Sequence, residues 1–168
     1  MEIRNKVIIV LISGGLDSAT VAGLANSSNA KIVGLSFDYG QRHKKELEAA
    51  KKIARHFQFK EFKIIKLDLS LWGGSSLTDI NRKIPMEGIN ANIIPNTYVP
   101  GRNTIFISIA LSYAEAINAD FIGLGVNALD YSGSQIVVQT ILNNSKNWQI
   151  YLIKEAEKIN LSNYGHLF

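Results

Sequence analysis

The sequence predicts an α/β fold, a Rossmann-like parallel sheet with helices on both faces. Short apolar runs alternate with segments of helical periodicity along residues 7–126. This alternation is typical of a parallel sheet covered on both sides. Connections between parallel strands are right-handed, which makes the predicted sheet Rossmann-like. Polar segments containing glycine follow three of the runs, at the strand ends where ligands bind in such sheets.

The first half of the chain contains two predicted strands and two predicted helices. Val7–Ile12 is wholly apolar and is expected to form a short buried strand. Helical periodicity follows over Asp17–Ser27, and Lys31–Phe37 (KIVGLSF) is the second predicted strand. Gln41–Phe57 is expected to form an amphipathic helix. Its apolar face would consist of Leu47, Ala50, Ile53, Ala54 and Phe57.

The pattern continues with a third strand at Phe62–Leu67, a helix over Asn103–Ile117 and a fourth strand at Asp120–Val126. Leu69–Val99 is rich in Gly, Ser, Asn and Pro and has no clear period, which predicts a long functional or mobile loop. The C-terminal tail is expected to form a helix. Its partial periodicity comes from Ile150, Ile153, Ala156 and Ile159.

Composition and charge are those of an ordinary globular protein of 168 residues, with 46% hydrophobic and 19% charged residues. The net charge of +4 is compatible with an anionic substrate but too small to indicate nucleic-acid binding. No run reaches the roughly 20 apolar residues of a membrane span. The chain has no cysteine, which excludes disulfides and thiolate metal sites. We therefore expect a cytoplasmic protein with no membrane or direct nucleic-acid partner.

The most informative segment is SGGLDS, Ser13–Ser18, between the first predicted strand and the first predicted helix. A glycine-rich turn there presents backbone N–H groups and the positive end of the helix dipole to one point, which suits a phosphate. The segment is neither a Walker loop nor GxGxxG. The backbone of Gly14 and Gly15 and the hydroxyls of the two terminal serines are expected to hold phosphates. Asp17 either places magnesium or caps the helix.

Three other segments begin at predicted strand ends or helix starts. SFDYGQRH, Ser36–His43, is expected to lie beside a nucleotide. In YVPGRNTIF, Tyr98–Phe106, Arg102 stands at a helix N-terminus. A cation there is unfavourable unless an anion is present, so Arg102 is a predicted phosphate ligand. Asn103 is expected to cap this helix, with a ligand contact as the alternative. GVNALDYSG, Gly125–Gly133, supplies hydrogen-bonding groups suited to a polar heterocycle.

SGG-x-DS is the signature of the ATP pyrophosphatase (PP-loop) superfamily. Together with GGSSLTD at residues 73–79, the four segments above resemble the 7-cyano-7-deazaguanine synthase family of queuosine biosynthesis, over residues 6–133. The resemblance implies an adenine nucleotide alpha-hydrolase type of fold. It also implies an ATP-dependent carbon–nitrogen ligase that converts 7-carboxy-7-deazaguanine and ammonia, through an amide, to the nitrile preQ0. ATP with Mg²⁺ would activate the carboxylate by adenylation, with phosphate transfer giving ADP as the alternative.

The expected site follows from these segments. Predicted nucleotide contacts are Ile12, Ser13, Gly14, Gly15, Leu16, Asp17, Ser18, Ala19, Thr20, Val21, Ala22, Ser36, Phe37, Gln41, Arg42 and Arg102. Predicted substrate contacts are Tyr39, Asn127, Asp130, Tyr131 and Ser132. The catalytic residues are unknown, with Asp17 and Arg102 as candidates, and no metal-ligating residue is predicted. Two other functions stay open: another PP-loop ATP pyrophosphatase, tRNA-modifying or amide-forming, and a non-catalytic nucleotide-binding module.

The resemblance stops after Gly133. The family continues with YPDCRPEF-like sequence and a zinc-binding cluster of cysteines, whereas this chain continues SQIVVQTI and has no cysteine. When the codons of residues 134–141 are read in a shifted frame, they permit the family sequence PDCRPDY. We therefore interpret residues 134–168 as a frameshifted tail. The PP-loop domain would then comprise residues 1–133. A genuine divergent C-terminus is the alternative. Loss of the zinc part, and of a fifth strand with it, predicts poor stability and weak activity. The intact family is expected to be homodimeric.

Overall fold

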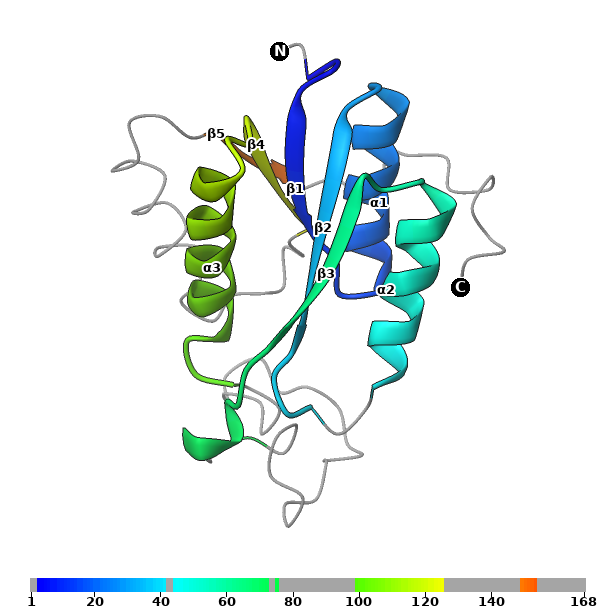
Figure 1. The fold of residues 1–168 in the computed structure, drawn as a ribbon. Helices are drawn as coiled ribbons and strands as arrows, with labels where there is room; N and C mark the ends of the chain where they lie inside the picture. Colours follow the sequence, from blue (N-terminus) through cyan, green and yellow to red (C-terminus); the bar gives the residue numbers. More distant parts are fainter. Residues whose placement is uncertain (1–2, 42–43, 73–74, 76–98, 126–148, 154–168) are drawn as a thin grey trace.

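The computed structural model describes residues 3–41, 44–72, 75, 99–125 and 149–153 (Figure 1). One parallel sheet of five strands has the order β3-β2-β1-β4-β5. Its strands are β1 (Val7–Leu11), β2 (Lys31–Asp38), β3 (Glu61–Lys66), β4 (Phe121–Gly125) and β5 (Gln149–Ile153). The helices are α1 (Leu16–Ser27), α2 (Lys45–His56) and α3 (Arg102–Ala116), with a 3-10 turn, η1 (Ser70–Trp72). The predicted α/β class is confirmed.

β1 is the central strand of the sheet. It pairs in parallel with β2 on one side, where Ile9 lies opposite Val33, and with β4 on the other, where Ile9 lies opposite Ile122. The side chain of Ile9 has no exposed surface, and its neighbours in the strand are nearly as buried. A strand enclosed by other strands and by helices has no solvent-facing side, which explains its unbroken apolar sequence.

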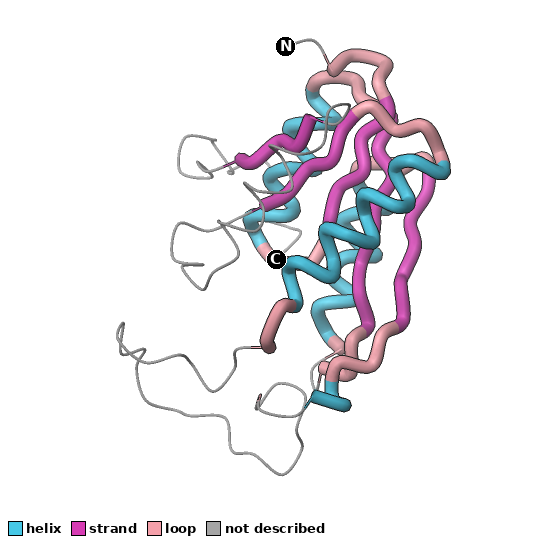
Figure 2. The backbone as a smooth tube through the Cα atoms, turned by 90° about the vertical axis from the view of Figure 1, so that its left-hand side faces the viewer, coloured by secondary structure: helices cyan, strands magenta, loops and turns pink. Residues whose placement is uncertain are grey.

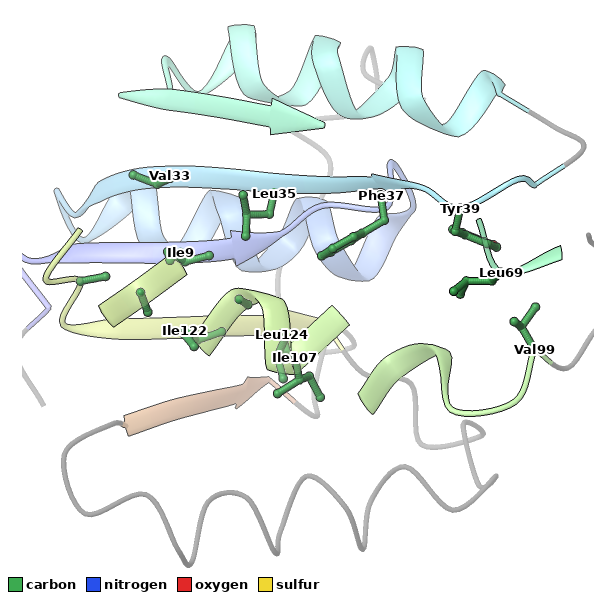
Figure 3. Close-up of a cluster of buried hydrophobic side chains, with 13 residues drawn as sticks. Ile9, Val33, Leu35, Phe37, Tyr39, Leu69, Val99, Ile107, Ile122 and Leu124 are labelled. Carbon is green, nitrogen blue, oxygen red and sulfur yellow. The ribbon is translucent and has the colours of Figure 1, made fainter. Parts of the chain in front are cut away.

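Helices cover both faces of the sheet, as predicted. α1 and α2 lie on one face, and α3 crosses the other, in front of the strands in Figure 2. The core beneath α1 and α2 includes Ile8, Val10, Ile32, Val21 and Ile53. The core beneath α3 includes Ile9, Val33, Leu35, Phe37, Ile107, Ile122 and Leu124 (Figure 3). Alternate residues of each strand supply the two cores, because successive side chains point to opposite faces.

The path of the chain reverses direction at β1. The segments β1-α1-β2-α2-β3 advance toward one edge of the sheet, and α3 then leads back to β4 on the other side of β1. The carboxyl ends of β1 and β4 are therefore neighbours at a topological switch point, the usual ligand site of open α/β sheets. These ends face the lower edge of the sheet in Figure 1.

Two expectations about secondary structure are wrong. The helix expected from Gln41 begins at Lys45, because the Gln41 side chain is bonded to the backbone of its own turn and the chain is still turning there. The tail was expected to be helical, yet Gln149–Ile153 is a strand. Its QIYLI sequence is rich in residues that favour strands, and the edge of β4 offers unpaired backbone groups. The tail thus supplies the fifth strand that we expected to be lost.

The remaining sequence-based expectations for the loop and tail lie mostly outside the described residues. Of the predicted loop Leu69–Val99, the structure describes residues 69–72, 75 and 99. No helix within the described part of the chain is long and apolar enough to cross a membrane.

Asp120 joins β1 and β4 at the amino-terminal ends of the two strands, opposite the switch point. Its Oδ2 accepts a hydrogen bond from the backbone N–H of Val7 at 2.8 Å, and its Oδ1 lies 3.2 Å from Nζ of Lys6. The Val7 N–H and the Lys6 ammonium hold the pKa of the Asp120 carboxyl below its ordinary value. Because the folded-state pKa is the lower one, the charged carboxylate stabilises the fold.

We expect Asp120→Ala to lower the free energy of unfolding by about 1 kcal/mol at pH 7, because the Val7 N–H loses its acceptor. The stabilisation by Asp120 is present above about pH 4 and is lost as the pH falls through the depressed folded-state pKa. Urea unfolding at pH 7 and at pH 3 measures this. Glu115→Ala, an exposed acidic residue of α3, is the control and should change little. An equal effect of Asp120→Ala at both pH values would contradict the prediction.

Candidate functional site

The SGGLDS segment forms a compact turn between β1 and α1. The Ser13 and Ser18 hydroxyl oxygens are 3.2 Å apart, and Ser18 Oγ donates to the Gly15 carbonyl at 2.9 Å. The Gly15 N–H donates to Ser13 Oγ at 3.2 Å, and the Ser13 N–H to Ser18 Oγ at 3.3 Å. Ser18 is buried and Ser13 is exposed. The first serine hydroxyl of the motif therefore remains accessible, while the second holds the turn together.

Gly14 allows the turn to lie directly against α2. Its φ is +91°, and a Cβ at this position would stand 2.3 Å from the carbonyl oxygen of Glu46 in the first turn of α2. A side chain is therefore excluded by both backbone conformation and space. The turn and the start of α2 form one packed unit, a contact that the sequence pattern does not indicate.

The N-terminus of α1 lacks a side-chain cap. Gly15 is the N-cap residue and makes no side-chain capping bond. The suggestion that Asp17 caps the helix is therefore wrong, and Asp17 lies in the first helical turn. The first N–H groups of a helix have no partner within it. With no cap, these groups and the helix dipole are available to an anion at the end of β1.

Glycines in β4 bring that strand against α1. A Cβ on Gly125 would lie 2.6 Å from the backbone carbon of Asp17, and one on Gly123 would lie 2.8 Å from Val21. The end of β4 therefore touches the first turn of α1. The predicted substrate residues of the polar segment that follows Gly125 lie outside the described part of the chain. They are Asn127, Asp130, Tyr131 and Ser132.

Residues 19–22, which were also predicted to be near the nucleotide, form the buried side of α1. Ala19, Val21 and Ala22 belong to the core against the sheet. The hydroxyl of Thr20 donates to the Leu16 carbonyl at 3.0 Å. Leu16 itself is 45% exposed at the start of the helix. Within the described residues, the accessible part of the predicted motif is thus its turn and the first residues of α1.

The segment after β2 is held by its own side chains. The Ser36 hydroxyl, which is buried, donates to the Ile12 carbonyl. This bond and the Ile12 N–H bond to the Leu35 carbonyl, at 2.8 Å, join the end of β2 to the SGGLDS turn. The Phe37 side chain lies on the face of the sheet that α3 covers. Its ring stacks on the ring of Phe106 in α3, with 3.9 Å between the two centroids.

Arg102 is the first residue of α3, as its predicted role requires. Gly101 precedes it as N-cap with a φ of +67° and no side-chain capping bond. The expectation that Asn103 caps this helix is therefore wrong, because Asn103 already lies inside the helix. Arg102 Nη1 donates to the phenol oxygen of Tyr39 at 3.2 Å. No described acidic residue forms an ion pair with Arg102.

The structure therefore joins the turn to the start of α2, to Ser36 and to the end of β4. Arg102 and Tyr39 contact each other on the face of the sheet that α3 covers. Arg42 lies outside the described residues. Sequence reasoning missed the contact between the turn and the Glu46 carbonyl, because a residue of any type has a backbone carbonyl. Among the described residues there is no group of three or more His, Cys, Asp or Glu placed to bind a metal ion.

We expect Gly14→Ala to destabilise the protein more than Gly40→Ala. Both glycines have left-handed φ values, +91° and +87°, which cost a non-glycine residue roughly 1–2 kcal/mol. A Cβ on Gly40 would meet only atoms 3.7 Å or more away, whereas one on Gly14 overlaps the Glu46 carbonyl. The overlap should add about 1–3 kcal/mol to the loss of unfolding free energy. Equal losses in urea unfolding would contradict this account of Gly14.

Comparison with known proteins identifies relatives over most of the chain. The family model of the queuosine biosynthesis protein QueC matches residues 7–135. A 7-cyano-7-deazaguanine synthase of Prochlorococcus marinus (strain MIT 9301) is 77% identical over 133 residues, 79% of this chain and 59% of the relative. The protein of the same name from Microcystis aeruginosa is 62% identical over 129 residues, 77% of this chain and 56% of that protein. The chain thus spans under two thirds of the length of these relatives.

Solved structures with the same fold have low sequence identity. A 4-thiouridine synthetase, in a complex with RNA and bound ATP, has a TM-score of 0.56 at 17% identity, covering 95% of this chain and 37% of that one. The NMN synthetase of Francisella tularensis has a TM-score of 0.50 at 16% identity, covering 74% of this chain and 47% of the other. These likenesses support the fold alone. From the family match and the identity of its relatives, this chain belongs to the family of the queuosine biosynthesis protein QueC.

Proposed function

We propose that residues 1–133 form the ATP-binding domain of a 7-cyano-7-deazaguanine synthase. The observation that carries this proposal is the uncapped N-terminus of α1 at the switch point of the sheet, formed by the SGGLDS sequence. Relatives at 77% and 62% identity bear the name of that enzyme and support it. Bound ATP in the more distant 4-thiouridine synthetase complex is consistent with the choice of nucleotide.

The triphosphate would lie across the turn. The uncapped first turn of α1 would offer its N–H groups to the phosphates, and the exposed Ser13 would offer its hydroxyl. Asp17 lies in this same first turn. Mg²⁺ is commonly bound by one or two carboxylates together with substrate phosphates, so Asp17 fits a magnesium ion shared with ATP. Arg102 would neutralise charge on the phosphates from the α3 side.

The reaction that we propose is activation of a carboxylate. The carboxylate oxygen of 7-carboxy-7-deazaguanine attacks the α-phosphorus of ATP, and pyrophosphate leaves. Ammonia then displaces AMP from the acyl adenylate, giving the amide and releasing a proton. The amide oxygen then attacks the α-phosphorus of a second ATP, pyrophosphate leaves, and loss of AMP together with the two amide protons gives the nitrile. The chain's own contribution is to bind and orient the phosphates and to stabilise the charge that develops on them.

Zinc does not fit the residues of this chain. The sequence contains no cysteine, and the described residues hold no cluster of other metal ligands. No step is therefore assigned to zinc. We further propose that the protein is cytoplasmic and acts on small molecules without a direct nucleic-acid partner, and that the intact family is homodimeric, as the family resemblance implies.

We propose that residues 134–168 are not family sequence. The family match ends at residue 135, and the alignment with the Prochlorococcus relative covers 133 residues. Sequencing the coding DNA across Gly133 tests this. A second frame that encodes PDCRPDY and then a cysteine cluster would support a frameshift. A closed second frame would make the tail genuine.

We expect the chain to bind Mg·ATP and Arg102→Gln to weaken that binding about tenfold or more, because a charge-assisted contact is lost. Titration calorimetry of the two proteins measures the dissociation constants. Arg55→Gln is a matched control, because Arg55 is exposed in the last turn of α2, away from the turn. Absence of ATP binding by the unaltered chain would contradict the proposed function.

We expect this chain alone to form no nitrile, and a chimera to form it. The chimera joins residues 1–133 to the remainder of the Prochlorococcus relative. Mass spectrometry would follow 7-carboxy-7-deazaguanine, the amide and the nitrile in the presence of Mg·ATP and ammonia. Ion chromatography would separate pyrophosphate and AMP from ADP and phosphate. A chimera that binds ATP but leaves the carboxylate unchanged would favour a different PP-loop activity.

A further inference from the structure

We propose that Tyr39 is a positioning residue, whose phenol holds the guanidinium of Arg102 in place to meet the phosphates. Gln41 supports it by fixing the turn that carries Tyr39. This inference rests on the proposed ATP site. It changes the expected roles of both residues, since Tyr39 was predicted to touch the second substrate and Gln41 the nucleotide.

Tyr39 is buried between the strand ends and α3. Its side chain is only 6% exposed, and it lies beside Leu69 and Val99 beyond the end of β2 (Figure 3). Its phenol oxygen accepts the hydrogen bond from Arg102 Nη1 at 3.2 Å. The guanidinium carbon lies 5.6 Å from the centre of the Tyr39 ring, within the range of a cation–π contact. Tyr39 therefore contacts Arg102 through both its ring and its hydroxyl.

Gln41 fixes the backbone that carries Tyr39. Its side chain is 6% exposed. Its Oε1 accepts the Tyr39 N–H at 2.7 Å, and its Nε2 donates to the Phe37 carbonyl at 3.1 Å. The Tyr39 carbonyl accepts the Leu69 N–H at 3.2 Å. Both backbone groups of Tyr39 are thus bonded, which limits where its side chain can point.

Phe106 fixes the other partner. It stands one helical turn after Arg102, so both lie on the same side of α3. Its ring stacks on Phe37 at 3.9 Å and meets the Tyr39 ring at 5.5 Å in a tilted arrangement. The rings of Phe37, Tyr39 and Phe106 therefore pack the start of α3 against the turn after β2. This packing keeps Arg102 close to Tyr39.

The chemistry of the pair suits anion binding. A guanidinium has five N–H donors in a plane, and the phenol uses one of them. A phenol is neutral, so it orients the cation without cancelling its charge, as a carboxylate would. A cation at a helix N-terminus opposes the helix dipole, so Arg102 gains little stability from its position. The charge retained there is available to phosphate.

The test is a double-mutant cycle on Mg·ATP affinity with the full chain. We expect Tyr39→Phe to weaken binding about fivefold to tenfold, because it removes the phenol bond and keeps the ring. In the Arg102→Gln background the same change should have less than about a twofold effect, since Tyr39 acts through Arg102. Tyr113→Phe is the matched control. Its phenol contacts Glu61 at 3.0 Å, at the start of β3, and ATP affinity should not change.

Thermal unfolding of each variant separates positioning from folding. A shared loss of stability in Tyr39→Phe and Tyr113→Phe, with weaker ATP binding only in the former, supports the inference. Gln41→Met has a similar shape but no amide, so it should weaken Mg·ATP binding as Tyr39→Phe does. If Tyr39→Phe does not fold, the Mg·ATP affinity of Gln41→Met tests the inference in its place. Unchanged affinity in Tyr39→Phe beside weakened affinity in Arg102→Gln would overturn the inference and leave the proposed function intact. Equal effects of Tyr39→Phe in both backgrounds would also overturn it.

Discussion

The pairing of β1 with β2 on one side and β4 on the other is the interaction on which the rest of the structure depends. It places β1, whose three middle residues are buried, at the centre of the sheet, and it makes the ends of β1 and β4 neighbours. The helix that follows β1 must then begin between those two strand ends. Because β1 is short and enclosed, the SGGLDS turn has little freedom of position. The uncapped start of α1 consequently lies at the switch point.

The close backbone contacts around that turn are possible because glycine has no side chain. Gly14 lets the turn approach the carbonyl of Glu46, and Gly125 lets the end of β4 approach Asp17. These contacts join the turn to α2 and to β4, while the Ser36 hydroxyl joins it to β2. Anion binding to backbone N–H groups needs groups that are already ordered, because ordering them on binding would cost conformational entropy. The site is therefore built as much by packing against the turn as by the turn itself.

The contact between Arg102 and Tyr39 depends on aromatic packing. Phe37, Tyr39 and Phe106 bring the end of β2 and the start of α3 together, although α2 and β3 come between the two segments along the chain. At the far edge of the sheet, β5 pairs with β4 using sequence that does not match the family. A strand edge accepts any segment that can offer backbone groups and apolar side chains. Continuation of the sheet therefore does not require the family's own sequence.

The sequence by itself determined the strands and helices that precede residue 126, because periodicity and apolar runs are properties of consecutive residues. It also placed a turn at SGGLDS, where we propose that phosphate binds, and it placed Arg102 at a helix start, since glycine, helix dipole and charge act locally. Only the tertiary structure decided that Gly14 lies on Glu46, that Gln41 closes on its own turn, and that Tyr39 meets Arg102, 63 residues away. It likewise decided that Gln149–Ile153 is a strand. Such pairings depend on which segments the crossovers bring together, and residue type alone does not encode them.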